Sequence, residues 1–320
     1  MKRLFADMHC DTITTLYDKI QKGSDETLRN NSLQLDFEKL AKSGYLLQNF
    51  AVFLDRDLWG KELCREAMLR IEFFRKQLAK NDEFIRPVTT VEEILQNEKE
   101  DRVSALLTLE GGEILEGNVD NLTEFHEKGV RMITLTWNYD NELGYSHFDK
   151  DGKGLTKLGF EVVERMEELH MIPDVSHGSD ALFFDVCKVT KKPFVASHSN
   201  ARSVYERSRN MSDEMIRALA ERGGVIGMNF FAGFTSARAE ADGMCYLDDI
   251  LAHMKHVVKV GGIECLGLGS DFDGIPTKVE WNDAAGMDYL LSGMGKAGFS
   301  ASECDKICKE NVLRLYRECL

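Results

Sequence analysis

The sequence predicts an α/β fold, a (β/α)8 TIM barrel, on three observations. Short apolar segments that end at polar residues alternate with amphipathic helical stretches, which is typical of parallel strands joined by crossover helices. Eight such apolar segments are present, the number of strands that closes this barrel. No G-x-G-x-x-G motif follows the first segment, which disfavours the alternative of an open doubly wound sheet. We therefore expect residues 1–320 to form a single domain, because barrels reach this length as one unit.

The expected strands are listed in chain order: Leu4–His9, Leu46–Phe53, Ser104–Leu109, Met132–Trp137, Ile172–Ser176, Phe194–Ser197, Gly224–Asn229 and Cys265–Ser270. Helical periodicity is clearest over four segments: Leu158–His170, Ser212–Arg222, Asp248–Val260 and Ser300–Leu320. Ser212 is expected to cap its helix, and the glycine pair that follows Arg222 is expected to end it.

Composition and charge narrow the class of protein. Lys and Arg total 40 against 54 Asp and Glu, a net charge of −14, which argues against nucleic acid as a partner because phosphate binding needs clustered positive charge. The first residues, Met1–Asp7, lack the apolar run of a signal peptide, and no segment has the apolar length that spans a bilayer. The eight cysteines are scattered and form no C-x-x-C pairs. We expect a cytoplasmic protein with reduced thiols and no membrane association.

The first and third expected strands end at side chains that bind metals. His9 and Asp11 are two residues apart, so in an extended chain they point to the same side and can bind one divalent ion. A strand-end histidine beside a helix-capping aspartate is the alternative interpretation of this pair. Glu110 follows a mostly apolar strand and precedes Gly111-Gly112, and such a glutamate is costly to bury without a cation or a donor. An exposed turn residue is the alternative for Glu110.

The fifth and sixth strands each end at a histidine. His177 closes D-V-S-H and His198 lies in S-H-S. A single histidine at a strand end is more often structural than a ligand. Two on adjacent strands favour a metal site, because the carboxyl ends of barrel strands share the active-site face.

The eighth strand ends in G-S-D-F-D-G, which contains Asp271 and Asp273. An aspartate that closes the last strand opposite a metal suits a general base. We assign Asp271 to catalysis and Asp273 to a turn with Gly274, and the reverse assignment is the alternative.

Together these residues form a set of three imidazoles and three carboxylates: His9, Asp11, Glu110, His177, His198 and Asp271. Five ligands exceed what one tetrahedral zinc ion with an open position needs. They suit two ions that share a bridging carboxylate and hold a water whose pKa is lowered, which is the apparatus for hydrolysing an amide.

In the order and content of these motifs the chain resembles the renal-type, or membrane, dipeptidases, a branch of the amidohydrolase-like barrels. The resemblance runs through H-x-D, L-E-G-G, D-V-S-H, S-H-S, S-R-N at Arg209 and G-S-D-F-D-G. It implies a dipeptidase that works through a hydroxide bridging two zinc ions, and whose dipeptide substrates include some with a C-terminal D-residue. It also implies a cytosolic, bacterial-like member, and a homodimer is the default oligomer for such a protein.

The resemblance also implies residue roles. His9, Asp11 and Glu110 would bind one zinc ion, and Glu110, His177 and His198 the other, with Glu110 as the bridge. Asp271 would be the acid/base. Arg209 would bind the substrate's C-terminal carboxylate, which its bidentate guanidinium suits.

One position departs from the family pattern. Eukaryotic members of the family usually carry a histidine at the end of the fourth strand that contacts the tetrahedral intermediate, and Trp137 stands there in this chain. Oxyanion stabilisation must then come from Asn138, Asn141, His147 or the metals alone, and we take Asn138 and His147 as candidate substrate contacts.

Two other functions stay open. Another amidohydrolase-type hydrolase of esters, lactones or cyclic amides is one, although those relatives usually have H-x-H on the first strand and often a lysine bridge. A non-catalytic scaffold barrel is the other, which the filled metal and acid/base positions disfavour.

Overall fold

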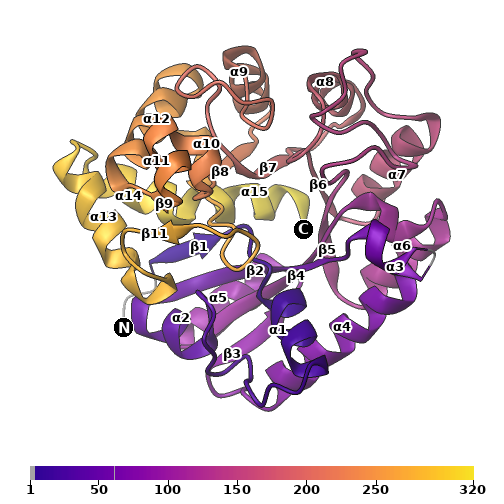
Figure 1. Cartoon of the computed structure of the whole chain (residues 1–320), viewed down its shortest axis with the longest axis horizontal. Coiled ribbons are helices and arrows are strands. Elements are labelled where there is room, and N and C mark those ends of the chain that lie inside the picture. Colours follow the sequence, from indigo (N-terminus) through magenta and orange to yellow (C-terminus); the bar gives the residue numbers. More distant parts are fainter. Residues whose placement is uncertain (1–3, 61) are drawn as a thin grey trace.

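The computed structural model describes residues 4–60 and 62–320, and within these residues eight parallel strands close into a barrel with helices around it (Figure 1). Each strand is hydrogen-bonded to the next and the last returns to the first, in the order β1 (Phe5–Asp7), β2 (Tyr45–Phe53), β4 (Val103–Glu110), β5 (Val130–Thr134), β6 (Ile172–Asp174), β7 (Val195–Ser199), β8 (Val225–Met228) and β10 (Leu266–Leu268). The predicted fold class is confirmed, and every expected strand overlaps an observed one. Met1, Lys2 and Arg3 of the expected N-terminal segment lie outside the described residues.

A strand that the sequence analysis did not anticipate lies outside the closed barrel. β3 (Ile85–Val88) pairs with the first half of β4, from Val103 to Leu106. It contains Pro87, which lacks a backbone donor and is tolerated only on an edge strand. The fourth expected strand, Met132–Trp137, is observed as Val130–Thr134, so Trp137 lies in the connection that follows it. A short parallel pair joins β9 (Met244–Cys245) to β11 (Lys278–Val279).

The helices lie around the strands and between them in the chain. Their bounds are α1 (Thr12–Gln21), α2 (Phe37–Ser43), α3 (Arg56–Trp59), α4 (Leu63–Ala79), α5 (Val91–Lys99), α6 (Val119–Glu127), α7 (Lys157–Glu168), α8 (Asp180–Val189), α9 (Asp213–Glu221), α10 (Ala232–Thr235), α11 (Ala237–Asp242), α12 (Leu247–Gly261), α13 (Met287–Lys296), α14 (Ala301–Asp305) and α15 (Asn311–Cys319). Ser212 caps α9 as expected, because its side chain accepts a hydrogen bond from the backbone amide of Met215.

The C-terminal helical segment, expected to be continuous, contains a π-helical turn over Lys306–Glu310. The side chain of Asn311 directly after this turn donates to the backbone oxygens of Ile263, at 2.7 Å, and Leu266, at 2.8 Å. These bonds hold this point of the segment against β10.

α15 closes the amino-terminal end of the barrel and runs across the middle of the ring in Figure 1. Its buried face packs with residues from the first halves of the strands in one apolar cluster, which includes Ala6, Leu46, Leu106, Met132, Ile172, Val195, Val225, Val312, Leu315 and Tyr316. With that end filled, we look for a site at the carboxyl ends of the strands, the active-site face of such barrels.

Two further features concern the chain as a whole. No helix within residues 4–60 and 62–320 is both long enough and apolar enough to cross a bilayer. All eight cysteines are free thiols.

Candidate metal centre and active site

The polar side chains at the carboxyl ends of the strands converge at the centre of the barrel. Glu110 ends β4 and His198 lies in β7, while His9, His177 and Asp271 follow β1, β6 and β10. All five side chains are buried, with at most 8% of any residue exposed. The structure therefore brings together residues that are up to 262 positions apart, and the closed barrel places them at one face.

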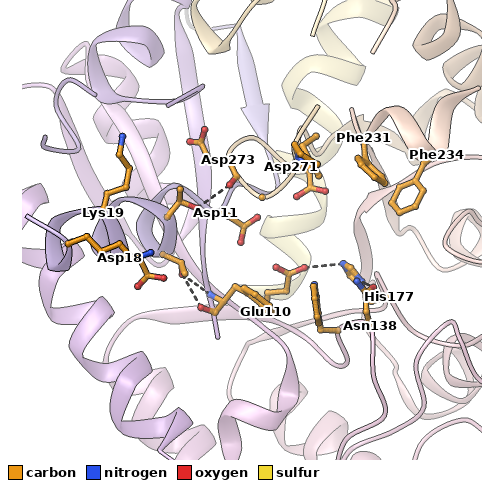
Figure 2. Close-up of a pocket in the computed structure, with 18 residues that line it drawn as sticks. Asp11, Asp18, Lys19, Glu110, Asn138, His177, Phe231, Phe234, Asp271 and Asp273 are labelled. Carbon is orange, nitrogen blue, oxygen red and sulfur yellow. Dashed lines mark hydrogen bonds and ion pairs between the residues drawn. The ribbon is translucent and has the colours of Figure 1, made fainter. Parts of the chain in front are cut away.

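Glu110 lies between the histidines. Its Oε1 atom is 3.1 Å from His177 Nε2 and 3.4 Å from His198 Nε2, whereas its Oε2 atom is 3.5 Å from His9 Nε2. Figure 2 shows the contact with His177 as a dashed line. The two oxygens of one carboxylate thus face different imidazoles, which is the arrangement of a bridging ligand.

Asp11 completes the His9 side of this cluster. Asp11 Oδ2 is 3.2 Å from His9 Nε2, and Asp271 Oδ1 is 3.9 Å from the same nitrogen. Asp11 occupies the position that precedes α1, but its side chain makes no capping bond. Its Oδ1 atom is buried without a hydrogen-bond partner among the described residues. An unpartnered buried carboxylate oxygen fits a bound cation better than a structural cap.

Two overlapping groups of ligand atoms have metal-binding proximity, and within each group all atoms lie within 4.8 Å of one another. The groups are His9, Glu110 and His198, and His9, Asp11 and Asp271. Both contain His9, whose ring stacks on that of His198 with centroids 3.9 Å apart. The cluster is compact enough for ions that share ligands.

The electrostatics of the cluster match the donor set of a divalent ion. Burial and the charge of Arg209 lower the pKa of His177 to about 3, and burial together with His9 holds the pKa of His198 well below its usual range, so both rings are neutral. Burial opposes ionisation of Glu110, but the charge of His9 keeps its pKa well below the usual value. Neutral imidazoles and ionised carboxylates are the forms that bind metals.

His9 differs from the other two histidines. Burial alone would lower its pKa, but the carboxylates of Glu110 and Asp11 hold it well above the usual range. A positive charge is therefore favoured at this position, and a bound cation would supply it. Burial raises the pKa of Asp271 to about 8, with the nearby carboxylates of Asp11 and Glu110 adding to the rise.

The two aspartates after β10 have different surroundings. Asp271 faces the cluster, and the side-chain amide of Asn229 donates to its Oδ2 at 2.9 Å. Asp273 accepts 2.6 Å hydrogen bonds from the Thr12 hydroxyl and the Gln34 backbone amide, and so holds the connections together. Gly274 packs directly against both carboxylates, because a Cβ there would lie 2.1 Å from Asp11 Oδ2 and 2.7 Å from Asp271 Oδ1. The division of roles between Asp271 and Asp273 stays a prediction.

A cavity of about 530 Å³ opens above the cluster and is lined by Asp11, Glu110, Asn138, His177 and Asp271. Phe53 and Trp137 form part of its wall, with ring centroids 4.7 Å apart. Phe231 and Phe234 lie across the cavity from Asp18 and Lys19 (Figure 2). Sequence reasoning did not anticipate the aromatic residues, except Trp137, because large apolar residues in connections give no signal of where they point.

Arg209 is buried close to the cluster, with 4% of its surface exposed. Its Nη1 atom donates to Ser199 Oγ at 3.0 Å, while Nε and Nη2 are buried with no partner in the described part of the chain. Burial lowers its pKa to about 10 and the carboxylates of Asp271 and Glu110 limit the decrease, so the guanidinium stays charged at neutral pH. A buried cation with unsatisfied N–H groups suits a carboxylate ligand.

The remaining two predicted site residues form a hydrogen-bonded group beside His177. Asn138 lines the cavity, and its Oδ1 atom is 2.7 Å from His177 Nδ1 and 3.0 Å from His147 Nε2. The other ring nitrogen of His147 is 2.8 Å from Ser208 Oγ. Asn138 lines the cavity above the cluster, whereas His147 borders a neighbouring groove of about 370 Å³.

A second hydrogen-bonded group supports His198 from within the barrel. His198 Nδ1 is 2.7 Å from Ser197 Oγ, which donates to Asp174 Oδ2 at 2.6 Å. Asp174 is the first residue of the D-V-S-H motif, and no role was predicted for it. The signal that identifies it is an aspartate at a strand end, three positions before a histidine.

Comparisons with known proteins identify the family of this chain. Residues 2–319 match the membrane dipeptidase family, peptidase family M19. An uncharacterized dipeptidase of Schizosaccharomyces pombe is 32% identical over 263 residues, which are 80% of this chain and 63% of that protein, so the chain spans less than two thirds of this relative. The crystal structure of dipeptidase AC, an M19 metallopeptidase, has a TM-score of 0.92 at 24% identity and covers 100% of this chain and 99% of its own. That of a metallopeptidase from Rhodobacter sphaeroides, liganded with a phosphinate mimic of the dipeptide L-Ala-D-Ala, has a TM-score of 0.91 at 22% identity and covers 100% of both chains.

Proposed function

This chain belongs to the membrane dipeptidase family, peptidase family M19, and from that premise we propose that it hydrolyses dipeptides at a site that holds two zinc ions. The observation that carries the proposal is the position of Glu110, whose two oxygens face separate groups of ligands. A carboxylate in a purely structural ion pair would not need its two oxygens to face separate groups of ligands.

The proposed ligand sets are those that the family resemblance implies, and the distances within the cluster support them. Glu110 Oε2, His9 and Asp11 would hold one ion, and Glu110 Oε1, His177 and His198 would hold the other. When bound, two such ions would polarise the scissile carbonyl and lower the pKa of the attacking water.

Asp271 is proposed to move the proton. Its Oδ1 atom faces the His9 side of the cluster, and Asn229 fixes its other oxygen. The carboxylate would accept a proton from the attacking water at Oδ1 and deliver it to the leaving amine nitrogen.

The proposed substrate is a dipeptide with a free C-terminal carboxylate, which would pair with the unsatisfied N–H groups of Arg209. The cavity of about 530 Å³ is within the range that encloses small ligands. The phosphinate mimic of L-Ala-D-Ala in the Rhodobacter sphaeroides neighbour supports a C-terminal D-residue among the substrates.

Hydrolysis of L-Ala-D-Ala and L-Ala-L-Ala by zinc-loaded protein tests this function, with metal analysis of the same sample. We expect two zinc ions per chain, cleavage of both dipeptides, and loss of cleavage on chelation. The substitution Asp271→Asn removes the proton acceptor and should lower kcat by roughly 10²- to 10⁴-fold, while Asp288→Asn on the exposed side of α13 should leave it unchanged.

Three results would contradict parts of the proposal. Zinc binding without cleavage of any dipeptide would show that the substrate class is wrong. Cleavage of L-Ala-L-Ala alone would remove the D-residue from the proposal. A single tightly bound ion in the active protein would remove the bridging role of Glu110.

A further inference from the structure

We infer that Asn138 is a positioning residue for His177, and that His147 holds Asn138 in the orientation this requires. The inference rests on the proposed function, because it assumes that His177 binds a metal through Nε2. It gives Asn138 and His147 a role other than the substrate contacts expected from the sequence.

The side-chain oxygen of Asn138 contacts two imidazole rings. Oδ1 is 2.7 Å from His177 Nδ1 and 3.0 Å from His147 Nε2. A carbonyl oxygen can only accept hydrogen bonds, so both imidazoles donate to it. One acceptor thus fixes a proton on one defined nitrogen of each ring.

The nitrogen that carries the proton of His177 decides whether Nε2 can bind a metal. A neutral imidazole carries one N–H, and placing it on Nδ1 leaves the lone pair of Nε2 directed at Glu110 Oε1, 3.1 Å away, and His198 Nε2, 2.9 Å away. If the amide of Asn138 were turned over, its NH2 group would donate to Nδ1, and the proton of His177 would move to Nε2. In that state His177 cannot bind a metal.

His147 favours the first orientation when its own ring proton is on Nε2. Its Nδ1 atom is 2.8 Å from the hydroxyl of Ser208, and when that hydroxyl donates to Nδ1, the ring proton lies on Nε2 and points at the Asn138 oxygen. The backbone amide of His147 also donates to the backbone oxygen of His177 at 2.7 Å. The connection that carries Asn138 and His147 is therefore bonded to the metal-ligand segment at two points.

The position of His147 supports this role over substrate contact. Both of its ring nitrogens are engaged, and the ring borders the groove that contains Arg202 and Ser208. Partners of this kind orient metal-binding histidines, and their removal typically costs roughly 10- to 100-fold in metal affinity.

Zinc affinity measured by competition with a chromophoric chelator tests the inference without reference to turnover. Asn138→Leu keeps the approximate size but removes the acceptor, and should weaken one of the two zinc sites by roughly 10- to 100-fold. Asn138→Asp offers a carboxylate that accepts from both rings, so it should retain both sites. The cobalt(II) absorption spectrum should change in the Leu variant and be restored in the Asp variant.

Two controls separate positioning from misfolding. Lys150→Ala alters an exposed residue of the same connection and should bind zinc like the unmodified chain. Thermal unfolding in the presence of chelator should give similar midpoints for all variants, because the acceptor matters chiefly for the loaded site.

The outcomes distinguish this inference from the function on which it rests. Equal zinc affinity of Asn138→Leu and the unmodified chain would overturn the inference alone. An Asn138→Asp variant that binds zinc as weakly as the Leu variant would also overturn it. Failure of the unmodified chain to bind zinc would overturn both proposals.

Discussion

The two histidines that flank Glu110 Oε1 are held by different hydrogen-bond partners, one set inside the barrel and the other in its connections. His198 is bonded through Ser197 to Asp174, and all three residues belong to β6 and β7 and are shielded from solvent. His177 is bonded through Asn138 to a chain that ends at the exposed Ser208. We call these the barrel support, formed by Asp174 and Ser197, and the loop support, formed by Asn138, His147 and Ser208.

The difference shows how burial sets the strength of an orienting contact. Asp174 accepts hydrogen bonds from the Thr134 and Ser197 hydroxyls, at 2.6 Å each, and from the backbone amides of Ser176 and Ser197. Water cannot replace these bonds inside the barrel, whereas it can replace the hydroxyl of Ser208. The barrel support therefore couples the ligand to the fold, and the loop support couples it only to neighbouring connections.

The largest effect is expected from Asp174→Ala, which breaks the barrel support. Four buried donors lose their acceptor, so the free energy of unfolding should fall by about 3–5 kcal/mol. Urea unfolding of the metal-free protein measures this change. A loss below about 1 kcal/mol would show that the strands do not depend on this carboxylate.

Asp174→Asn distinguishes the effect of the barrel support on stability from its effect on zinc affinity. The amide oxygen can keep both backbone bonds, so stability should fall less than in Asp174→Ala. The hydroxyl of Ser197 no longer has a carboxylate to donate to, and can donate to His198 Nδ1 instead, which would place the ring proton on Nε2. Zinc affinity should therefore fall by roughly 10- to 100-fold, and unchanged affinity would contradict this chain of bonds.

A pH-dependent effect is expected at Glu113, which anchors the connection that carries the loop support. Glu113 is buried in the turn after β4, and its carboxyl accepts from the Asn141 side chain at 2.8 Å. Burial raises its pKa from 4.5 to about 7. Between these two pKa values the folded chain keeps a proton on Glu113 that the unfolded chain releases. The contribution of Glu113 to stability is therefore fully present below about pH 4.5 and is lost as the pH rises to about 7.

Glu113→Gln should abolish this loss, because an amide does not titrate. Relative to the unmodified chain, the variant should gain up to about 3 kcal/mol between pH 5 and pH 8, at 1.36 kcal/mol per pKa unit. Urea unfolding at both pH values, with chelator present to exclude metal effects, measures the gain. Glu127→Gln, at an exposed position of α6, is the control. An equal difference at both pH values would contradict the raised pKa.

The contrast between strand ends and connections also explains which residues could be predicted from the sequence. His198 and Glu110 were identified because a parallel barrel places the ends of its strands on one face, so position in the strand fixes position in the site. The fold follows from the same periodicity, and β3 was missed because Pro87 interrupts its pattern.

Residues in the connections were less predictable. The functional assignment of Arg209 came from the family resemblance, because one arginine in a polar segment has no periodicity to place it. Asn138 and His147 were named as pocket residues, but their bonds to His177 depend on the path of the connection after β5. The hydrogen bond from Asn229 to Asp271 was not predicted, because the two residues lie 42 positions apart in the chain.

The smallest effects come from one substitution made at both supports. Ser197→Ala leaves His198 Nδ1 without its buried partner, so stability should fall by about 1–3 kcal/mol and zinc affinity with it. Ser208→Ala removes an exposed hydroxyl that water can replace, and stability should change by less than about 0.5 kcal/mol. Urea unfolding and chelator competition on both variants compare the supports directly. Equal losses would mean that the loop support is as strongly coupled to the fold as the barrel support, because removal of the same hydroxyl group would then cost the same inside the barrel and at its rim.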